Sequence, residues 1–383
     1  MSGSKRATAQ TTRAVATPAS AAPQLPGQIV LVMQGGGALG AFQAGVYQAL
    51  HEAGIEPDWV LGTSIGAINA ALIAGNAPES RLERLQAFWH RLGHSASPMV
   101  RWYEMAGLGN GLRTLEIMGT GLAPFFVPDF GAWLGWDASS DTGSAGLYST
   151  APLRATLGEL IDFERITAGA TRLTLGSVNV NSGRMRYFDN RKEPLSLDHV
   201  MASGALPPAF PAVLIDGEPY WDGGVYSNTP IEVVMDDVPR RDAVVFAAEL
   251  WQQRGTTPRT IIDTLKRHKD IQFASRADSH IARQQQIHRL RHVIHEMAQW
   301  LPATAVNNAR VRELLAYGCM TVMHVLPLRT PTLRGEDHAK DIDFSPDSIQ
   351  ARWQAGLEIT RQRLCEAPWQ KASDPLAGVV VHE

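Results

Sequence analysis

The chain has 383 residues, 44% of them hydrophobic, so it can bury one large core or two smaller ones and is not broadly disordered. A formal net charge of -3 excludes a general attraction to nucleic acid or to anionic membranes, and no nucleic-acid partner is expected. Two cysteines, Cys319 and Cys365, are too few for a disulfide framework or a thiolate metal site. We therefore expect a cytoplasmic protein with no metal and no cofactor.

Residues 1–27 are rich in Ala, Thr, Ser and Pro and show no apolar periodicity. This composition predicts a disordered tail, and it lacks the continuous apolar stretch of a signal peptide. The longest run of small apolar residues, 67–74, is far shorter than the roughly 20 residues of a membrane span. Any membrane contact is therefore expected to be peripheral.

Ordered structure is expected to begin with two strands separated by a helix. The apolar run 28–34 is typical of a strand buried on both faces, and residues 59–61 form the second strand. Residues 41–53 carry apolar side chains at helical spacing, and further helices are predicted at 67–74 and 78–92. This order predicts a parallel sheet covered by helices, in which ligands bind at the carboxyl ends of the strands.

The segment 98–146 differs from its surroundings because it is rich in glycine and aromatic residues. The aromatic residues are Trp102, Tyr103, Phe125, Phe126, Phe130, Trp133 and Trp136. One interpretation is a lid or an apolar wall over a cleft, and the other is a helical subdomain whose aromatic residues form its own core.

Regular structure returns with two predicted hairpins, which join residues 172–179 to 184–188 and residues 212–216 to 219–221. A buried strand follows at 243–249. We then expect long polar helices, a late strand and a final amphipathic helix, at 258–297, 303–316, 320–327 and 345–367.

Three regions are predicted: a tail at 1–27, a catalytic domain at 28–250 and a mostly helical C-terminal extension at 251–383. Basic residues exceed acidic ones between 258 and 292. That surplus fits either a solvated helix face or contact with anionic lipid headgroups.

The pentapeptide from Gly62 to Gly66 has the pattern G-x-S-x-G and lies between the second strand and a helix of small residues. Such a turn lifts a serine hydroxyl out of a sharp bend, and the glycines allow the chain to pass close to itself. Ser64 is therefore a candidate nucleophile. Alternatively, Ser64 merely caps the helix that follows.

Gly35, Gly37 and Gly40 form a G-x-G-x-x-G loop after the first strand. Dinucleotide-binding folds share this spacing, but they need an acidic residue where this chain has its serine turn. A P-loop would need Lys-Ser or Lys-Thr, and neither follows the loop. The loop still offers a row of backbone amides at a helix N-terminus, which suits an oxyanion.

A serine nucleophile needs a base, which is usually histidine. In an α/β-hydrolase the nucleophile follows several strands, whereas Ser64 follows the second, and His199 and His268 are predicted on helix faces. Asp222 instead ends a strand and precedes Gly223 and Gly224. A carboxylate there becomes an effective base only if burial raises its pKa from about 3.9.

These motifs resemble those of patatin-like phospholipases in order and spacing, over residues 28–250. The matching segments are the glycine loop 35–40, the serine turn 62–66, Ala202-Ser-Gly-Ala-Leu-Pro-Pro and Asp222-Gly-Gly. The resemblance implies a three-layer α/β/α fold with a central, mainly parallel sheet. Residues 250–300 resemble the C-terminal extension of a bacterial subgroup of the family.

The resemblance also implies a catalytic dyad, in which Ser64 attacks an ester carbonyl and Asp222 takes the serine proton. The backbone amides of the loop would hold the oxyanion, namely those of Gly35, Gly36, Gly37 and Ala38. The motif glycines would be Gly40, Gly62, Gly66, Gly223 and Gly224. Many family members carry a basic residue where this chain has Leu39, so headgroup recognition by that charge is not expected here.

The sequence thus predicts a lipid acyl hydrolase of the phospholipase A type, with a lipid ester as substrate. The alternative is a regulatory protein that keeps the fold and binds lipid or a partner with little turnover.

Overall fold

The computed structural model describes residues 25–93, 110–129, 131–132, 145–274, 277–333 and 336–383, with side chains left out at 110–114. The predicted tail therefore lies almost wholly outside the described residues. So do five aromatic residues of the predicted insertion: Trp102, Tyr103, Phe130, Trp133 and Trp136.

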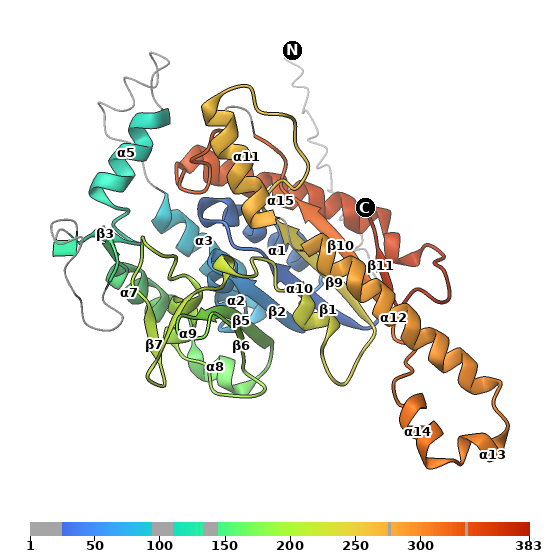
Figure 1. Ribbon diagram of the computed structural model, residues 1–383. Helices are drawn as coiled ribbons and strands as arrows, with labels where there is room; N and C mark the ends of the chain where they lie inside the picture. The colour runs from blue at the N-terminus through green and yellow to red at the C-terminus, as the bar shows by residue number, and fades with distance from the viewer. Residues whose placement is uncertain (1–24, 94–109, 130, 133–144, 275–276, 334–335) are drawn as a thin grey trace, which may run out of the picture.

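A nine-stranded sheet forms the centre of the molecule (Figure 1). Its order is β11-β10-β9-β1-β2-β5-β8-β7, and β6 also pairs with β5. The run from β11 to β5 is parallel, while β6, β7 and β8 add antiparallel pairs. The strands are β1 (Gln28–Met33), β2 (Trp59–Thr63), β5 (Arg172–Asn179), β6 (Met185–Asp189), β7 (Val213–Ile215), β8 (Glu218–Asp222), β9 (Ala243–Glu249), β10 (Met323–Arg329) and β11 (Val379–Val381).

Helices cover both faces of this sheet because its central strands are apolar on both sides. Along β1, Leu31 and Met33 join the larger hydrophobic cluster, which includes helices α1 (Ala41–Glu52), α2 (Ile65–Ala74), α3 (Pro78–Leu92) and α15 (Pro346–Glu366). The alternate residues Val30 and Val32 pack with α10 (Ile231–Met235) and α12 (Ala277–Gln299). The predicted three-layer arrangement is confirmed.

The remaining elements are mostly short. They are α5 (Asn110–Thr120), β3 (Val127–Pro128), β4 (Tyr148–Ser149), α7 (Ala151–Leu160), α8 (Phe163–Ala168), α9 (Leu197–Ser203), α11 (Ile261–Ala274), α13 (Ala303–Val306), α14 (Ala309–Leu315) and the 3₁₀ turns η1 (Gly37–Gly40), η2 (Gly223–Val225) and η3 (Pro368–Gln370). In the part of the chain that the structure describes, no helix is long and apolar enough to cross a membrane.

The C-terminal residues contribute to the same sheet as the N-terminal ones. Strand β10 pairs with β9, and β11 pairs with β10. One sheet therefore contains strands from both sides of residue 250, which is the predicted end of the catalytic domain. The prediction of one helix over 303–316 is wrong, because Asn308 starts α14 by accepting hydrogen bonds from the Arg310 and Val311 amides.

Candidate active site

Ser64 lies in the sharp turn between β2 and α2, and its backbone is strained. Its φ is 58°, in the left-handed region that non-glycine residues rarely adopt. A Cβ on Gly62 would lie 2.2 Å from Gly66 backbone atoms, and a Cβ on Gly66 would lie 2.2 Å from the Met33 carbonyl oxygen. Ser64 makes no side-chain capping bond to α2, so the capping interpretation does not describe its hydroxyl.

A second serine, Ser203, holds this turn in place. Its Oγ accepts a hydrogen bond from the Ser64 amide at 3.1 Å and donates one to the Gly176 carbonyl at 2.6 Å. Ser203 is buried at the end of α9, so its hydroxyl ties the serine turn to β5. No role for Ser203 was predicted, although it lies in the segment Ala202-Ser-Gly-Ala-Leu-Pro-Pro that resembles the family and precedes the glycine that ends α9.

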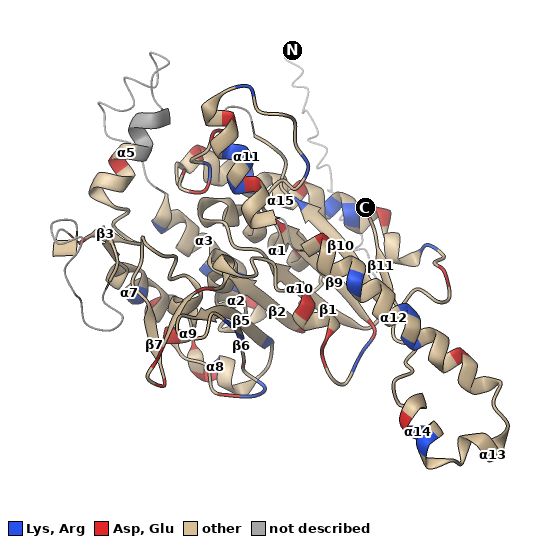
Figure 2. Cartoon of the chain, in the orientation of Figure 1, with Lys and Arg blue, Asp and Glu red and all other residues tan. Residues whose placement is uncertain are grey.

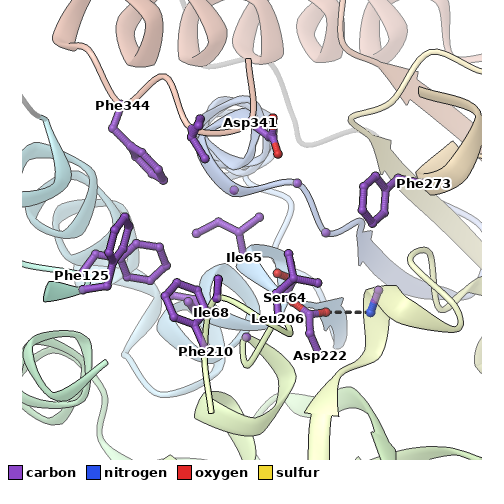
Figure 3. A pocket seen from close by; sticks show the side chains of 18 of the residues that line it. Ser64, Ile65, Ile68, Phe125, Leu206, Phe210, Asp222, Phe273, Asp341 and Phe344 are labelled. Carbon is purple, nitrogen blue, oxygen red and sulfur yellow. Dashed lines mark hydrogen bonds between the residues drawn. The ribbon is translucent and has the colours of Figure 1, made fainter. Parts of the chain in front are cut away.

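Asp222 lies at the end of β8 and faces the Ser64 side chain (Figure 3). The Gly224 amide donates a 2.7 Å hydrogen bond to Asp222 Oδ1. Burial raises the pKa of the Asp222 carboxyl from its ordinary 3.8 to about 7, although hydrogen bonds from the Ser64 hydroxyl and the Gly224 amide act in the opposite direction. The carboxylate therefore gains a proton affinity suited to a base at neutral pH.

The glycine loop presents two open amides to the cavity beside Ser64. The Gly35 amide donates to the Asn228 carbonyl at 3.1 Å, and the Ala38 amide donates to the Asp341 carbonyl at 2.8 Å. The amides of Gly36 and Gly37 have no hydrogen-bond partner among the described residues. Of the four predicted oxyanion donors, Gly36 and Gly37 are therefore the two that are free in this structure.

The direction of the Gly36 amide is set by the carbonyl of the preceding residue. Gly35 O accepts hydrogen bonds from Trp251 Nε1 at 2.7 Å and from Asn228 Nδ2 at 3.0 Å. In a trans peptide the N–H points opposite to the C=O, so these two donors hold the Gly36 N–H away from themselves. Trp251 and Asn228 are positioning residues that the sequence analysis did not identify.

A mostly apolar cavity of about 240 Å³ adjoins Ser64 and Asp222. Phe125 and Phe126 of the predicted insertion form part of its wall, together with Ile117 of α5. Phe125 also makes ring contacts with Phe210, at 6.1 Å between centroids, and with Phe344, at 5.9 Å. These side chains give the cavity an apolar wall. Most of the predicted lid at 98–146 lies outside the described residues.

The C-terminal region supplies another side of the cavity, through Phe273, Asp341 and Phe344 (Figure 3). The Asp341 carboxylate pairs with Lys269 at 2.7 Å. Next to it, Lys340 and Asp270 form a buried ion pair at 2.7 Å. Two ion pairs thus hold the segment around residue 341 against α11.

Comparison with known families agrees with this geometry. The family model described as patatin-like phospholipase matches residues 31–235, more than half of the chain. The chain belongs to the patatin-like phospholipase family. A second model, described as patatin phospholipase, matches residues 271–376, so family likeness extends into the C-terminal region of this patatin-like protein.

Curated relatives match only a short part of this patatin-like chain. It is 60% identical over 47 residues to lysophospholipase nte1 of Aspergillus terreus, covering 12% of this chain and 3% of the relative. It is 46% identical over 61 residues to mouse (Mus musculus) patatin-like phospholipase domain-containing protein 6, covering 16% of this chain and 4% of the relative. The chain thus spans under one-twentieth of the length of these relatives.

Among solved structures, VipD from Legionella pneumophila matches 88% of this chain and 67% of its own, with 17% identity and a TM-score of 0.37. That score is too low to support an argument about function.

Two further sequence expectations concern residues around the patatin-like site. Leu39, which replaces the basic residue common in the family, is fully buried in the main hydrophobic cluster. His199 accepts a hydrogen bond from the Ser196 amide within the capping box of α9. Among the described residues that line the cavity there is no histidine, and the described chain contains no cluster of His, Cys, Asp and Glu able to hold a metal.

Proposed function

We propose that this protein is a serine acyl hydrolase that cleaves carboxyl esters of lipids, with Ser64 as nucleophile and Asp222 as base. The observation that carries the proposal is the buried Asp222 carboxyl, which faces the side chain of a strained serine in the wall of one cavity. A serine that only stabilised a turn would need neither the strain nor the buried carboxyl.

In the acylation step, the Ser64 hydroxyl transfers its proton to the Asp222 carboxylate while its oxygen attacks the ester carbonyl. The negative charge that develops on the carbonyl oxygen is stabilised by the free amides of Gly36 and Gly37. Collapse of this intermediate expels the alcohol, which takes the proton from Asp222, and leaves an acyl group on Ser64.

In the deacylation step, Asp222 takes a proton from water as the water oxygen attacks the acyl group. The Ser64 oxygen leaves with that proton, which regenerates the enzyme and releases a carboxylic acid. The net reaction is therefore ester plus water to acid plus alcohol.

The apolar cavity supports a lipid substrate, because acyl carbons gain about 0.8 kcal/mol for each buried CH₂ group. The wall formed by Phe125, Phe210 and Phe344 suits an acyl chain. Two free thiols, Cys319 and Cys365, support a reducing compartment, and we propose the cytoplasm with peripheral membrane contact. The division into a catalytic domain at 28–250 and an extension at 251–383 is part of this proposal.

The test is hydrolysis of a p-nitrophenyl acyl ester and labelling by a fluorophosphonate probe. Ser64→Ala and Asp222→Asn are each expected to abolish hydrolysis while circular dichroism stays unchanged. Asp216→Asn is the matched control and is expected to retain full activity, because Asp216 is exposed at a turn. Activity retained by either dyad variant overturns the dyad, and failure of the wild type to label Ser64 in the presence of lipid favours the low-turnover binding protein.

A further inference from the structure

Helix α11 buries charged as well as apolar side chains on its inner face, and it leaves aliphatic side chains exposed on its outer side. On the inner face, Asp270 is buried in its ion pair with Lys340. On the outer face, Ile261 is 81% exposed, Ile262 is 54% exposed and Leu265 is 48% exposed. Several exposed aliphatic residues on one helix indicate a surface that meets an apolar partner.

A basic hollow of about 740 Å³ lies at the base of this helix, between its inner side and the loop before it. Its lining includes Arg254 and Arg259, whose guanidinium groups make no ion pair or hydrogen bond with any residue that the structure describes. Arg267 donates only to the carbonyl oxygens of Gln252 and Gln253, so its charge has no acidic partner there. Figure 2 shows the Lys and Arg residues on α11 and on the loop before it. Asp263 and Asp270 also line the hollow, but with Lys266 and the three arginines its basic residues outnumber its acidic ones by four to two, so it carries net positive charge that is available to an external anion.

The exposed aliphatic residues belong to a helix that also reaches the proposed active site. Phe273, near the end of α11, lines the apolar cavity. Met118 of α5 lines the same cavity and is 45% exposed, and Leu115 of α5 is 64% exposed. Figure 1 shows α5 and α11 at the same end of the molecule. Exposed apolar side chains are thus found on two helices that border the cavity.

We propose that the N-terminal end of α11, together with the loop before it, docks on the surface of an anionic lipid bilayer. The aliphatic residues Ile261, Ile262 and Leu265 enter the boundary of the acyl chains, while Arg254 and Arg259 bind the anionic headgroups. A bilayer fits because it offers apolar and anionic layers side by side, which matches the aliphatic side chains and the basic hollow at the N-terminal end of α11. This docking proposal rests on the proposed function only in taking lipid as the substrate. Docking itself requires no turnover.

The test is cosedimentation with vesicles, carried out on a Ser64→Ala background so that no lipid is consumed. One vesicle contains phosphatidylcholine alone, and the other contains phosphatidylcholine with phosphatidylglycerol. The parent protein is expected to bind the anionic vesicle more tightly. Ile261→Ser with Leu265→Ser is expected to weaken that binding at least about tenfold, given the transfer free energy of two aliphatic side chains.

Matched controls come from exposed residues far from the cavity. Leu290→Ser with Met297→Ser, on the exposed side of α12, is expected to leave vesicle binding unchanged. Arg254→Gln with Arg259→Gln is expected to remove the preference for anionic vesicles, because each basic residue contributes about 1 kcal/mol at such a surface. With Ser64 restored, the aliphatic double variant is expected to hydrolyse a soluble short-chain ester at the wild-type rate.

Three results would overturn the docking face: no vesicle binding by the parent protein, no effect of the α11 aliphatic variant, or an equal effect of the α12 control. An absent preference for anionic lipid in the parent protein overturns the role of the arginines. If the wild-type protein does not hydrolyse a soluble ester, the proposed function is overturned instead. Failure of docking and failure of catalysis are therefore distinguishable.

Discussion

The buried carboxyl of Asp222 is expected to lower the stability of the folded protein at alkaline pH, and Asp222→Asn removes that cost. The pKa of Asp222 rises from 3.8 to about 7 on folding. Below pH 3.8 the carboxyl is protonated in both states and costs nothing. Between pH 3.8 and pH 7 it is ionised mainly in the unfolded state, so the cost grows with pH, and above pH 7 it is ionised in both states and the cost is constant. At about 1.4 kcal/mol for each tenfold change in the ionisation constant, this cost reaches about 4 kcal/mol above pH 7. Asparagine keeps an oxygen for the Gly224 amide but has no charge to bury.

The assay is urea denaturation of both proteins at pH 5.0 and pH 8.5. At pH 5.0 only part of the cost has developed, so the free energy of unfolding of Asp222→Asn relative to wild type should rise by about 2 to 3 kcal/mol between the two pH values. Asp216→Asn is the control, because this carboxylate lies exposed at a turn, and its difference from wild type should not change with pH. A constant or shrinking advantage of Asp222→Asn as pH rises would refute the reasoning.

Three further predictions concern catalysis and stability. The rate of acylation of Ser64 should rise with pH and reach half of its maximum near pH 7, because Asp222 must be ionised to accept the serine proton; a rate that falls over pH 6 to 8 contradicts this. Trp251→Phe removes one of the two hydrogen-bond donors to Gly35 O and should lower kcat about tenfold with little change in KM. Trp369→Phe is the control and should have no effect, since Trp369 Nε1 has no hydrogen-bond partner among the described residues. An equal loss in both tryptophan variants would exclude a positioning role. Lys340→Met leaves Asp270 buried without its partner and should lower the free energy of unfolding by about 3 to 5 kcal/mol, and adding Asp270→Leu should restore most of it in urea denaturation.

The backbone order of the fold could be predicted because most of its elements are specified locally. The strand Gln28–Met33 is an uninterrupted apolar run, and the last helix begins where Ser345 and Pro346 indicate, with Ser345 Oγ accepting a hydrogen bond from the Ser348 amide. The hairpins also followed from local patterns, since turn residues separate the strands they join.

The proximity of Ser64 and Asp222 was also within reach of the sequence. The family resemblance implied it, and the register of the sheet accounts for it: β8 runs antiparallel to β5, and Asp222 pairs with Ser177, the residue after Gly176, which pairs with Thr63. The sequence could show that Asp222 needs a raised pKa to act as a base. The size of the pKa shift depends on burial by residues from several elements.

The hydrogen bonds that position the site could not be predicted, because each joins residues far apart in the chain. The Trp251 ring nitrogen bonds to a carbonyl 216 residues earlier, and the Ser203 hydroxyl accepts from an amide 139 residues earlier. Neither side chain has a local pattern that reveals its partner. The strand Val379–Val381 was missed for a related reason, since three residues pair with β10 only once β10 has joined the sheet.

The position of β10 affects the order in which the chain can fold during synthesis. Ser64 and Asp222 have both been made by residue 222, before β9, β10 and the cavity wall that contains Asp341 and Phe344. At roughly 5 to 20 residues per second, that wall follows Asp222 after a delay on the order of 10 s. A nascent chain therefore carries Ser64 and Asp222 before the cavity beside them is complete, so the proposed hydrolase activity is expected to appear only after Asp341 and Phe344 have been added.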